Sequence, residues 1–147
     1  MLRIRNELAA KRRKARHFGV QALYKGHMTG GNPDEIVSEF CDEYDFINVD
    51  VEYFSSLLHS ISSQVGELEA VLLPILDRKI DDLDPIERSV LCLGTFELKK
   101  RPDIPYKVVI SESVALAKKF GATDSHRYIN GVLAKVARLL RSDEMVS

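Results

Sequence analysis

Residues 11 to 24 read Lys11-Arg12-Arg13-Lys14-Ala15-Arg16-His17-Phe18-Gly19-Val20-Gln21-Ala22-Leu23-Tyr24 and predict an amphipathic helix with a basic beginning. At about 100° per residue, one side carries the small and apolar residues that suit a core, namely Ala15, Phe18, Gly19, Ala22 and Leu23. The roughly opposite side carries cations, a β-branched residue and an aromatic ring, namely Arg13, Arg16, His17, Val20 and Tyr24. A cationic side with an aromatic ring can neutralise phosphates and offer a base or a protein partner a packing surface. It can also be a solvated basic surface with one stray tyrosine, and the helix alone favours neither interpretation.

The composition is that of a folded globular protein with an uneven distribution of charge. With 147 residues, 45% hydrophobic and 29% charged, the chain suits one domain or two small subdomains that share a core. The formal net charge is -1, yet the first 17 residues carry seven Lys and Arg against Glu7, and residues 26 to 77 contain no Lys or Arg. Acids of that second segment include Asp34, Glu35, Glu39, Asp42, Glu43, Asp45, Asp50 and Glu52. A positive end and a negative flank favour oriented binding of a polyanion.

The sequence disfavours several classes of protein and site. Cys41 and Cys92 lie far apart without a CxxC pair, so we expect no zinc site and two buried, reduced thiols, as in a cytoplasmic protein. No run of about 18 apolar residues predicts a membrane span, and the N-terminus lacks the apolar core of a secretory signal. A mitochondrial transit peptide is disfavoured because no Ser or Thr precedes Thr29.

Capping residues, glycines, prolines and helical periodicity predict six further helices after the basic one. Two of them begin with an N-cap residue followed by proline, at Asn32-Pro33 and Asp84-Pro85. Because no alternating strand segment is flanked by turns, the expected fold class is all-α, with about seven helices. The six are expected at about residues 32–44, 51–65, 66–76 (with a kink or break at Pro74), 84–98, 106–120 and 124–140. Their expected core stripes contain Ile36, Val37, Phe40, Cys41, Tyr44, Val51, Phe54, Leu58, Ile61, Val65, Leu68, Val71, Leu72, Ile75, Leu76, Val90, Leu91, Gly94, Leu98, Ile129, Val132, Leu133, Val136, Leu139 and Leu140.

No arrangement of residues predicts catalysis. Asp124-Ser125-His126 contains the side chains of a nucleophilic triad, but consecutive helix residues diverge by about 100°, so a helix N-cap at Asp124 or Ser125 is the better interpretation. The four histidines show no HExxH spacing, and neither a GxGxxG nor a GxxxxGK[ST] loop is present. We therefore expect no enzyme, no cofactor and no metal site.

A second candidate surface lies on the last predicted helix. Tyr128 flanks the apolar stripe there, beside Gly131 and Lys135 and one turn after Asp124. An aromatic ring next to a lysine can stack on an unpaired base while the cation meets a phosphate. Alternatively, the ring packs at the edge of the core with its hydroxyl in water, and the spacing favours neither.

Five groups of residues form recognisable motifs: the basic residues before Ala22-Leu23-Tyr24, then Leu83-Asp84-Pro85-Ile86-Glu87-Arg88, Asp103-Ile104-Pro105-Tyr106-Lys107-Val108, Ala115-Leu116-Ala117-Lys118-Lys119-Phe120-Gly121 and Tyr128-Ile129-Asn130-Gly131-Val132-Leu133. In order and spacing, these motifs resemble those of the NusB family of transcription antitermination factors. The resemblance covers about residues 11 to 140 and implies an all-helical fold of two small packed bundles without catalysis. We accordingly expect a flexible basic arm at residues 1–10, helical subdomains at 11–80 and 81–141, and a tail at 142–147.

The resemblance also implies partners and their contact residues. Family members pair with NusE, a ribosomal small-subunit protein, and the pair binds the single-stranded boxA element of nascent RNA. That complex joins elongating RNA polymerase with NusA and NusG and suppresses termination, chiefly in ribosomal RNA operons. The family's RNA-binding positions fall on Arg12, Arg13, Lys14, Arg16, Asp124 and Tyr128, and we add the neighbouring Lys135. Its NusE-binding positions fall on Tyr24 and Glu87, and we add Val20 from the outward side of the basic helix.

Three residues depart from the family pattern. Ser111 replaces a usual Asn, and Tyr128 replaces a usual Phe but keeps a stacking face. Cys92 stands where many relatives carry Arg, which would remove one cation from the RNA or partner surface. The alternative function is a protein-only helical module that binds an acidic partner or forms a homodimer without specific RNA recognition. A preference for boxA-like over scrambled RNA distinguishes the two functions.

Overall fold

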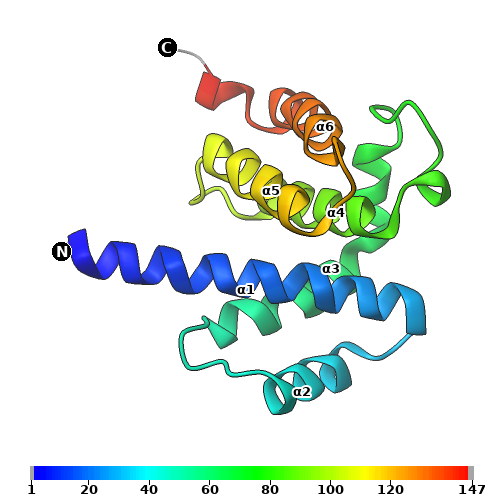
Figure 1. Ribbon diagram of the computed structural model, residues 1–147. Coiled ribbons are helices and arrows are strands. Elements are labelled where there is room, and N and C mark those ends of the chain that lie inside the picture. Colours follow the sequence, from blue (N-terminus) through cyan, green and yellow to red (C-terminus); the bar gives the residue numbers. More distant parts are fainter. Residues whose placement is uncertain (1, 146–147) are drawn as a thin grey trace. The chain divides into compact units, whose positions relative to one another are not determined.

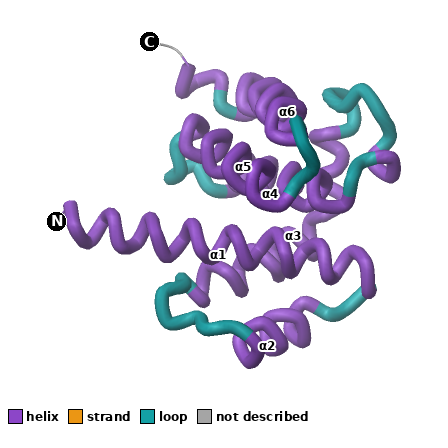
Figure 2. The backbone as a smooth tube through the Cα atoms, viewed as in Figure 1, coloured by secondary structure: helices purple, strands orange, loops and turns teal. Residues whose placement is uncertain are grey.

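The computed structural model describes residues Leu2 to Met145. All regular secondary structure in that part of the chain is helical, which confirms the all-α fold class. Six α-helices and two short 3-10 helices are present among these residues (Figure 1), joined by loops and turns (Figure 2). Their bounds are α1 Leu2–Thr29, α2 Pro33–Glu43, α3 Val51–Leu72, η1 Ile80–Asp82, α4 Pro85–Lys100, α5 Tyr106–Phe120, α6 Ser125–Leu140 and η2 Ser142–Met145. None of the helices in this range is long and apolar enough to cross a membrane.

The chain divides into two compact units within α3. The first unit is Met1–Ser63 and the second is Gln64–Ser147, and each is described by itself below. Residues 2–10, expected as a flexible arm, are the first turns of α1, and residues 142–145 of the expected tail form η2. Residue 1 of the arm and residues 146–147 of the tail lie outside the described residues.

The third and fourth predicted helices are one helix, which makes six α-helices and not seven. α3 continues through Gly66, because a single exposed glycine costs a helix only about 1 kcal/mol relative to alanine. α3 ends at Leu72, two residues before Pro74, since proline disfavours helical backbone in the residue that precedes it. The break predicted at Pro74 is therefore present, whereas the break predicted at Gly66 was wrong.

The first unit contains α1, α2 and the first part of α3 (Figure 1). All three helices contribute rings to its aromatic core. The ring centroid of Phe18 lies 4.6 Å from that of Phe46, 5.2 Å from that of Tyr44 and 6.4 Å from that of Phe40. Phe46 comes from the acidic segment after α2 and was missing from the predicted stripes. Conversely, Val51 and Val65 were predicted in the core of α3 but are exposed. Helical periodicity predicts which side of a helix is apolar, but not over what length other elements pack against that side.

Two helices begin with the caps that the sequence predicts. The side chain of Asn32 accepts a hydrogen bond from the backbone N–H of Asp34 at 2.8 Å, and Pro33 follows at the first helical position of α2. Asp84 accepts from the backbone N–H of Glu87 at 3.3 Å, with Pro85 next in α4. Both predicted caps are confirmed.

The second unit is built around α4, which is buried on all sides from Ser89 to Leu98 and contacts both α5 and α6 (Figure 2). The predicted one-sided stripe of α4 was therefore too narrow. Gly94 allows the close approach, since a Cβ atom there would lie 2.8 Å from a methyl carbon of Leu133 in α6 and 2.9 Å from Oγ of Ser113 in α5. Leu139, predicted in the core of α6, is exposed instead.

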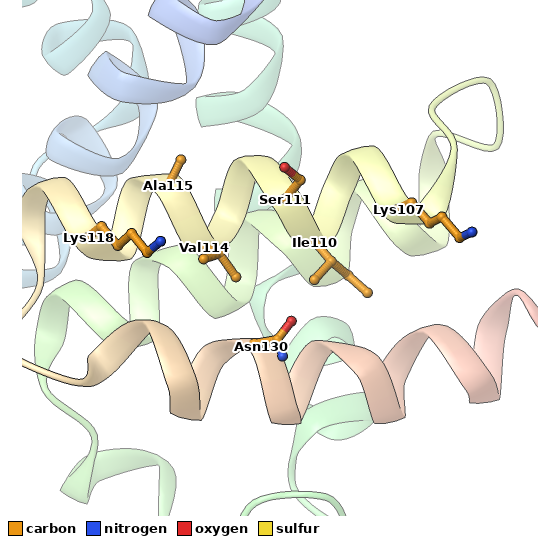
Figure 3. A pocket seen from close by; sticks show the side chains of 7 residues that line it. All are labelled: Lys107, Ile110, Ser111, Val114, Ala115, Lys118 and Asn130. Carbon is orange, nitrogen blue, oxygen red and sulfur yellow. The ribbon is translucent and has the colours of Figure 1, made fainter.

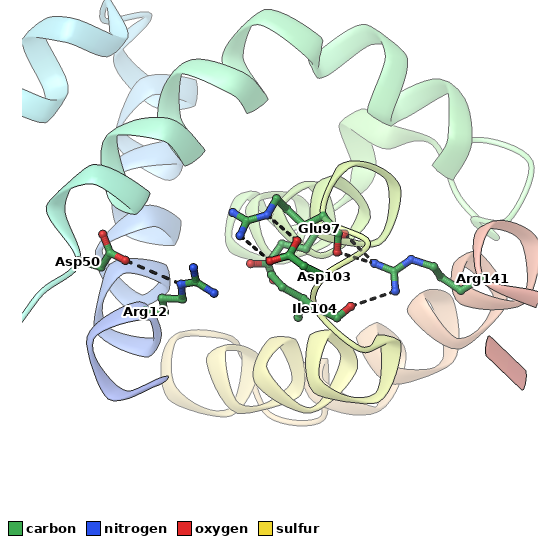
Figure 4. Close-up of polar contacts among 7 residues, drawn as sticks. Arg12, Asp50, Glu97, Asp103, Ile104 and Arg141 are labelled. Carbon is green, nitrogen blue, oxygen red and sulfur yellow. Dashed lines mark hydrogen bonds and ion pairs between the residues drawn. The ribbon is translucent and has the colours of Figure 1, made fainter. Parts of the chain in front are cut away.

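Arg141 closes the second unit through backbone carbonyl groups (Figure 4). Its guanidinium is buried and donates to the carbonyl oxygens of Leu98 at 2.7 Å, Arg101 at 2.8 Å and Ile104 at 2.9 Å. It also pairs with Glu144, whose other carboxylate oxygen accepts from the backbone N–H of Tyr106 at 3.1 Å. Glu144 thus caps α5, whose own N-cap residue is a proline without a side-chain acceptor.

Candidate nucleic-acid interface

The basic helix α1 presents fewer residues to solvent than its sequence predicts. Arg13 and Lys14 are exposed as expected, whereas Arg16 is only 5% exposed and Val20 is 0% exposed. Buried residues between Ala15 and Ala22 cover about 160° of the helix circumference at about 100° per residue, which is wider than a one-sided stripe. The predicted outward orientation of Arg16 and Val20 was therefore wrong.

Two of the four predicted RNA-binding cations of α1 are held by residues at the start of α3. Nε of Arg12 lies 3.8 Å from a carboxylate oxygen of Asp50 (Figure 4). The guanidinium groups of Arg12 and Arg16 lie 5.5 Å and 5.6 Å from the ring centroid of Tyr53, within cation–π range. Binding of a phosphate by either arginine would have to compete with these contacts.

The residues predicted to bind NusE belong to different units and differ in exposure. Tyr24 in α1 is 36% exposed, so its ring is available to a partner. Glu87 in α4 is 8% exposed, and its carboxylate accepts a hydrogen bond from Oγ of Ser125 at 2.9 Å. Glu87 therefore ties the start of α4 to the start of α6, a role that its sequence position does not reveal.

Tyr128 of α6 lines a shallow pocket of about 280 Å³ together with residues that the sequence placed beside it. Its hydroxyl group donates a hydrogen bond to Oδ1 of Asp77 at 3.0 Å, and the guanidinium of Arg78 lies 4.3 Å from its ring centroid. Nε of Arg78 donates to the same oxygen of Asp77 at 2.8 Å. The lining residues are Ile75, Asp77, Arg127, Tyr128, Gly131, Val132 and Lys135.

The charges around this pocket favour an ionised Asp77. The hydrogen bond from Arg78, followed by the one from Tyr128, lowers the pKa of the Asp77 carboxyl group. Burial, followed by the hydrogen bond to Asp77, raises the pKa of the Tyr128 hydroxyl group, so it stays protonated and donates. Sequence reasoning missed Asp77 and Arg78, because a charged pair in the loop after Pro74 carries no periodic or motif signal.

Asp124 precedes α6 in the left-handed backbone region, with φ 69° and ψ 0°. It occupies the predicted N-cap position, but its side chain makes no capping hydrogen bond and instead lies 3.6 Å from Nε of Arg127 in an exposed ion pair. Ser125, the other predicted N-cap, is buried and donates to Glu87. The carboxylate of Asp124 is exposed at the same end of α6 as Tyr128.

The positions that depart from the family pattern lie in two different environments of the second unit. Ser111 lines a groove of about 480 Å³ between α5 and α6, in which Asn130 projects from α6 toward Ile110 and Val114 (Figure 3). Cys92 is buried, which raises the pKa of its thiol to about 12. Cys92 itself adds almost nothing to the surface of this chain, since it is only 5% exposed.

The cysteines and the residues that could bind a metal were also located within residues 2 to 145. Cys41, expected to be buried, is half-buried, and both cysteines are free thiols. Within that range no three His, Cys, Asp or Glu side chains are grouped so that they could hold a metal ion.

Known proteins resemble this chain over almost its whole length. The sequence profile described as the NusB family matches residues 13–138. The transcription antitermination protein NusB of Alcanivorax borkumensis is 50% identical over 133 residues, which cover 90% of this chain and 89% of that protein. The protein of the same name from Pseudomonas savastanoi pv. phaseolicola is 50% identical over 137 residues, which cover 93% of this chain and 83% of that protein.

Solved structures agree with these sequence relatives. A structure of T. maritima NusB superimposes with a TM-score of 0.80 at 26% identity, covering 90% of this chain and 95% of that one. The structure of the antitermination factors NusB and NusE in complex with double-stranded RNA gives a TM-score of 0.80 at 28% identity, covering 95% and 99%. With the predicted motifs, the all-α fold and these matches in agreement, the chain belongs to the NusB family of transcription antitermination factors.

Proposed function

We propose that this antitermination factor binds boxA-like single-stranded RNA of nascent ribosomal RNA transcripts together with NusE, within an RNA polymerase elongation complex that includes NusA and NusG. Support comes from the relative of known structure, which is in complex with NusE and with double-stranded RNA. Support for a single-stranded element comes from this chain's own residues, as follows.

The pocket at Tyr128 is the observation that carries the proposal. Its partly exposed ring lies beside the exposed cations Arg127 and Lys135, which combines a stacking face with groups that neutralise phosphates. A ring in a shallow pocket can stack only on a base that has left a helix, because paired bases in a duplex already stack on one another. Asp124 at the same end of α6 adds an acceptor for base amino groups.

The cations of α1 are proposed to meet the phosphates. Arg13 and Lys14 are exposed and suited to that role, and Lys11 is exposed beside them. Arg12 would bind a phosphate after leaving its ion pair with Asp50. Arg16 would bind a phosphate from its place beside the ring of Tyr53, where its guanidinium is held. The phosphate contacts of α1 therefore depend mainly on three of its exposed cations.

Tyr24 is proposed to carry the NusE contact of the first unit, since its ring is exposed. In the second unit, Glu87 is proposed to support the binding of NusE indirectly, because its hydrogen bond with Ser125 holds the beginning of α6 in place. Val20 is fully buried, so we leave it out of the contact surface.

A protein-only module is the second candidate function, and one observation favours it. The first turns of α1 expose Leu2, Ile4 and Leu8, three large apolar residues that suit a protein partner or a second copy better than RNA. Selectivity for RNA sequence separates the two candidates.

The test is equilibrium binding of fluorescent boxA-like and scrambled RNA, with and without NusE, across a salt series. Three phosphate contacts predict that log K falls with log salt at a slope of about -2, at about -0.7 per contact for single strands. The double variant Arg13→Gln and Lys14→Gln should flatten this slope by about 1.4. The matched control, Lys107→Gln and Lys118→Gln, removes two exposed cations from the groove between α5 and α6 and should leave the slope unchanged. Equal binding of both RNAs, indifferent to NusE, would favour the protein-only module.

A further inference from the structure

Asp77 places a carboxylate in the lining of the Tyr128 pocket, next to the hydroxyl end of the tyrosine ring. Both residues line the pocket, and the Tyr128 hydroxyl group holds Oδ1 of Asp77 at 3.0 Å. Within residues 2 to 145, the contact of the second oxygen, Oδ2, is a long one of 3.4 Å with a guanidinium nitrogen of Arg78. Because a carboxylate oxygen has two lone pairs, Oδ2 keeps the capacity to accept from a ligand.

The ring and the carboxylate are fixed relative to each other by three contacts. Arg78 lies over the ring of Tyr128 and donates to Asp77, and Tyr128 donates to the same Asp77 oxygen. The three residues come from the loop after α3 and from α6, so the arrangement ties that loop to the helix. The tie through the hydroxyl group needs tyrosine, since phenylalanine has no donor at that position.

An ionised carboxylate accepts hydrogen bonds and cannot donate them, so it discriminates between bases. Cytosine, adenine and guanine each present an amino group that can donate, whereas uracil offers a single donor, N3–H, placed between two carbonyl oxygens that a carboxylate repels. We propose that Asp77 makes the Tyr128 pocket selective for a base that carries an amino group and against uracil. This inference rests on the proposed function, because it requires that the pocket receives an RNA base.

The experiment measures dissociation constants for a set of short boxA-like RNAs in which each position in turn is replaced by uracil. For the unmodified protein, uracil at the position that enters the pocket should weaken binding by about fivefold to tenfold, the lower range of one base contact. Asp77→Asn should erase that difference, because its amide can donate to a uracil carbonyl as well as accept from an amino group. Tyr128→Phe should keep most of the affinity for the best RNA but reduce the selectivity, because the ring remains while Asp77 loses one of the two hydrogen bonds that hold Oδ1.

Asp82→Asn is the matched control, since it removes one negative charge from an exposed position of the same unit. Removal of a charge by itself strengthens binding to every RNA equally, so the control should shift all affinities together and keep the selectivity. If Asp77→Asn behaves like Asp82→Asn, the inference about Asp77 is overturned while RNA binding stands. If the unmodified protein does not distinguish boxA-like from scrambled RNA, both the inference and the proposed function fail.

Discussion

At the start of α6, a single residue combines a backbone requirement with a charge. Asp124 has φ 69°, a conformation that costs most L-residues roughly 1–2 kcal/mol and that Asp, Asn and Gly adopt more readily. Its ion pair with Arg127 is exposed on both sides, and such pairs contribute little to stability. An acid at this position therefore has a conformational reason to be there as well as a possible RNA contact.

Substitutions at position 124 separate these two roles. Asp124→Asn keeps the left-handed preference, so we expect the free energy of unfolding to change by less than about 0.5 kcal/mol while RNA affinity falls if the carboxylate contacts a base. Asp124→Ala should lower the free energy of unfolding by about 1 kcal/mol, because alanine is strained in this region. Urea denaturation followed by circular dichroism measures the first quantity, and RNA titration the second. Equal stability of the Asn and Ala variants would contradict the conformational role.

Residue contacts were the part of the candidate site that the sequence predicted least well. Tyr128, Gly131 and Lys135 lie in one pocket, as their helical spacing suggested. Asp77 completes that pocket from a segment about 50 residues earlier in the chain, and its neighbour Arg78 lies over the ring of Tyr128. Nothing local in the sequence indicates that either residue meets Tyr128. Arg16 was assigned to the surface because its helical angle places it away from the apolar stripe, yet it packs near the ring of Tyr53.

At the scale of elements, the two helical glycines Gly66 and Gly94 have opposite surroundings. A Cβ atom at Gly66 would meet nothing within 4 Å, whereas one at Gly94 would clash with side chains from α5 and α6. Both of those side chains, Ser113 and Leu133, are buried and have little room to move. The close packing of α4 in the second unit thus depends on one glycine, while α3 merely tolerates the other.

Alanine at the two glycines should change stability in opposite directions. Gly94→Ala should lower the free energy of unfolding by about 1–2 kcal/mol, because overpacking of about 1–3 kcal/mol outweighs the gain of up to about 1 kcal/mol in helix propensity. Gly66→Ala should raise it by about 0.5–1 kcal/mol, since propensity acts there alone. Denaturant titrations of both variants against the unmodified protein test the pair. A stabilised Gly94→Ala variant would show that the neighbouring helices can move apart.

Across the whole molecule, ionisable groups stabilise the two units in different ranges of pH. In the second unit, three carboxyl groups have lowered pKa values: Glu67 beside Lys99 and Lys100, Asp77 beside Arg78 and Tyr128, and Glu144 beside the N–H of Tyr106 and Arg141. In the first unit, hydrogen bonds to the carbonyl of Ser55 and to Asp34 raise the pKa of His59. A carboxyl group with a lowered pKa stabilises the folded state at pH values above about 4, its unfolded pKa, and this contribution is lost as the pH falls. A histidine with a raised pKa stabilises the folded state below about pH 6.5, and this contribution is lost as the pH rises.

Glu144→Gln tests the acidic range of this dependence. Near pH 6 the variant should be less stable than the unmodified protein, because an uncharged amide is a weaker cap for α5 and a weaker partner of Arg141. The difference should shrink as the pH falls below the unfolded value of about 4 and through the lowered pKa of Glu144, because protonation removes the charge of this carboxyl group in the unmodified protein. Thermal unfolding at several pH values measures it, with Asp143→Asn in the same 3-10 helix as the control for loss of an exposed acid. A difference that stays constant with pH would rule out this role of the charge.

Local chemistry in the sequence was enough for the helices, their caps and the family. Helical periodicity, an N-cap residue followed by proline, and ordered motifs act over a few residues, so they predicted the all-α fold, the beginnings of α2 and α4, and the resemblance. Burial and pairing depend on side chains that are distant in sequence. The tertiary structure alone therefore revealed three features: the wide buried arc of α1, the contacts of Asp77 and Arg78 with Tyr128, and the cluster of carbonyl groups around Arg141. A long-range contact has no local period or motif, because its free energy is gained only when the folded chain brings the two segments together.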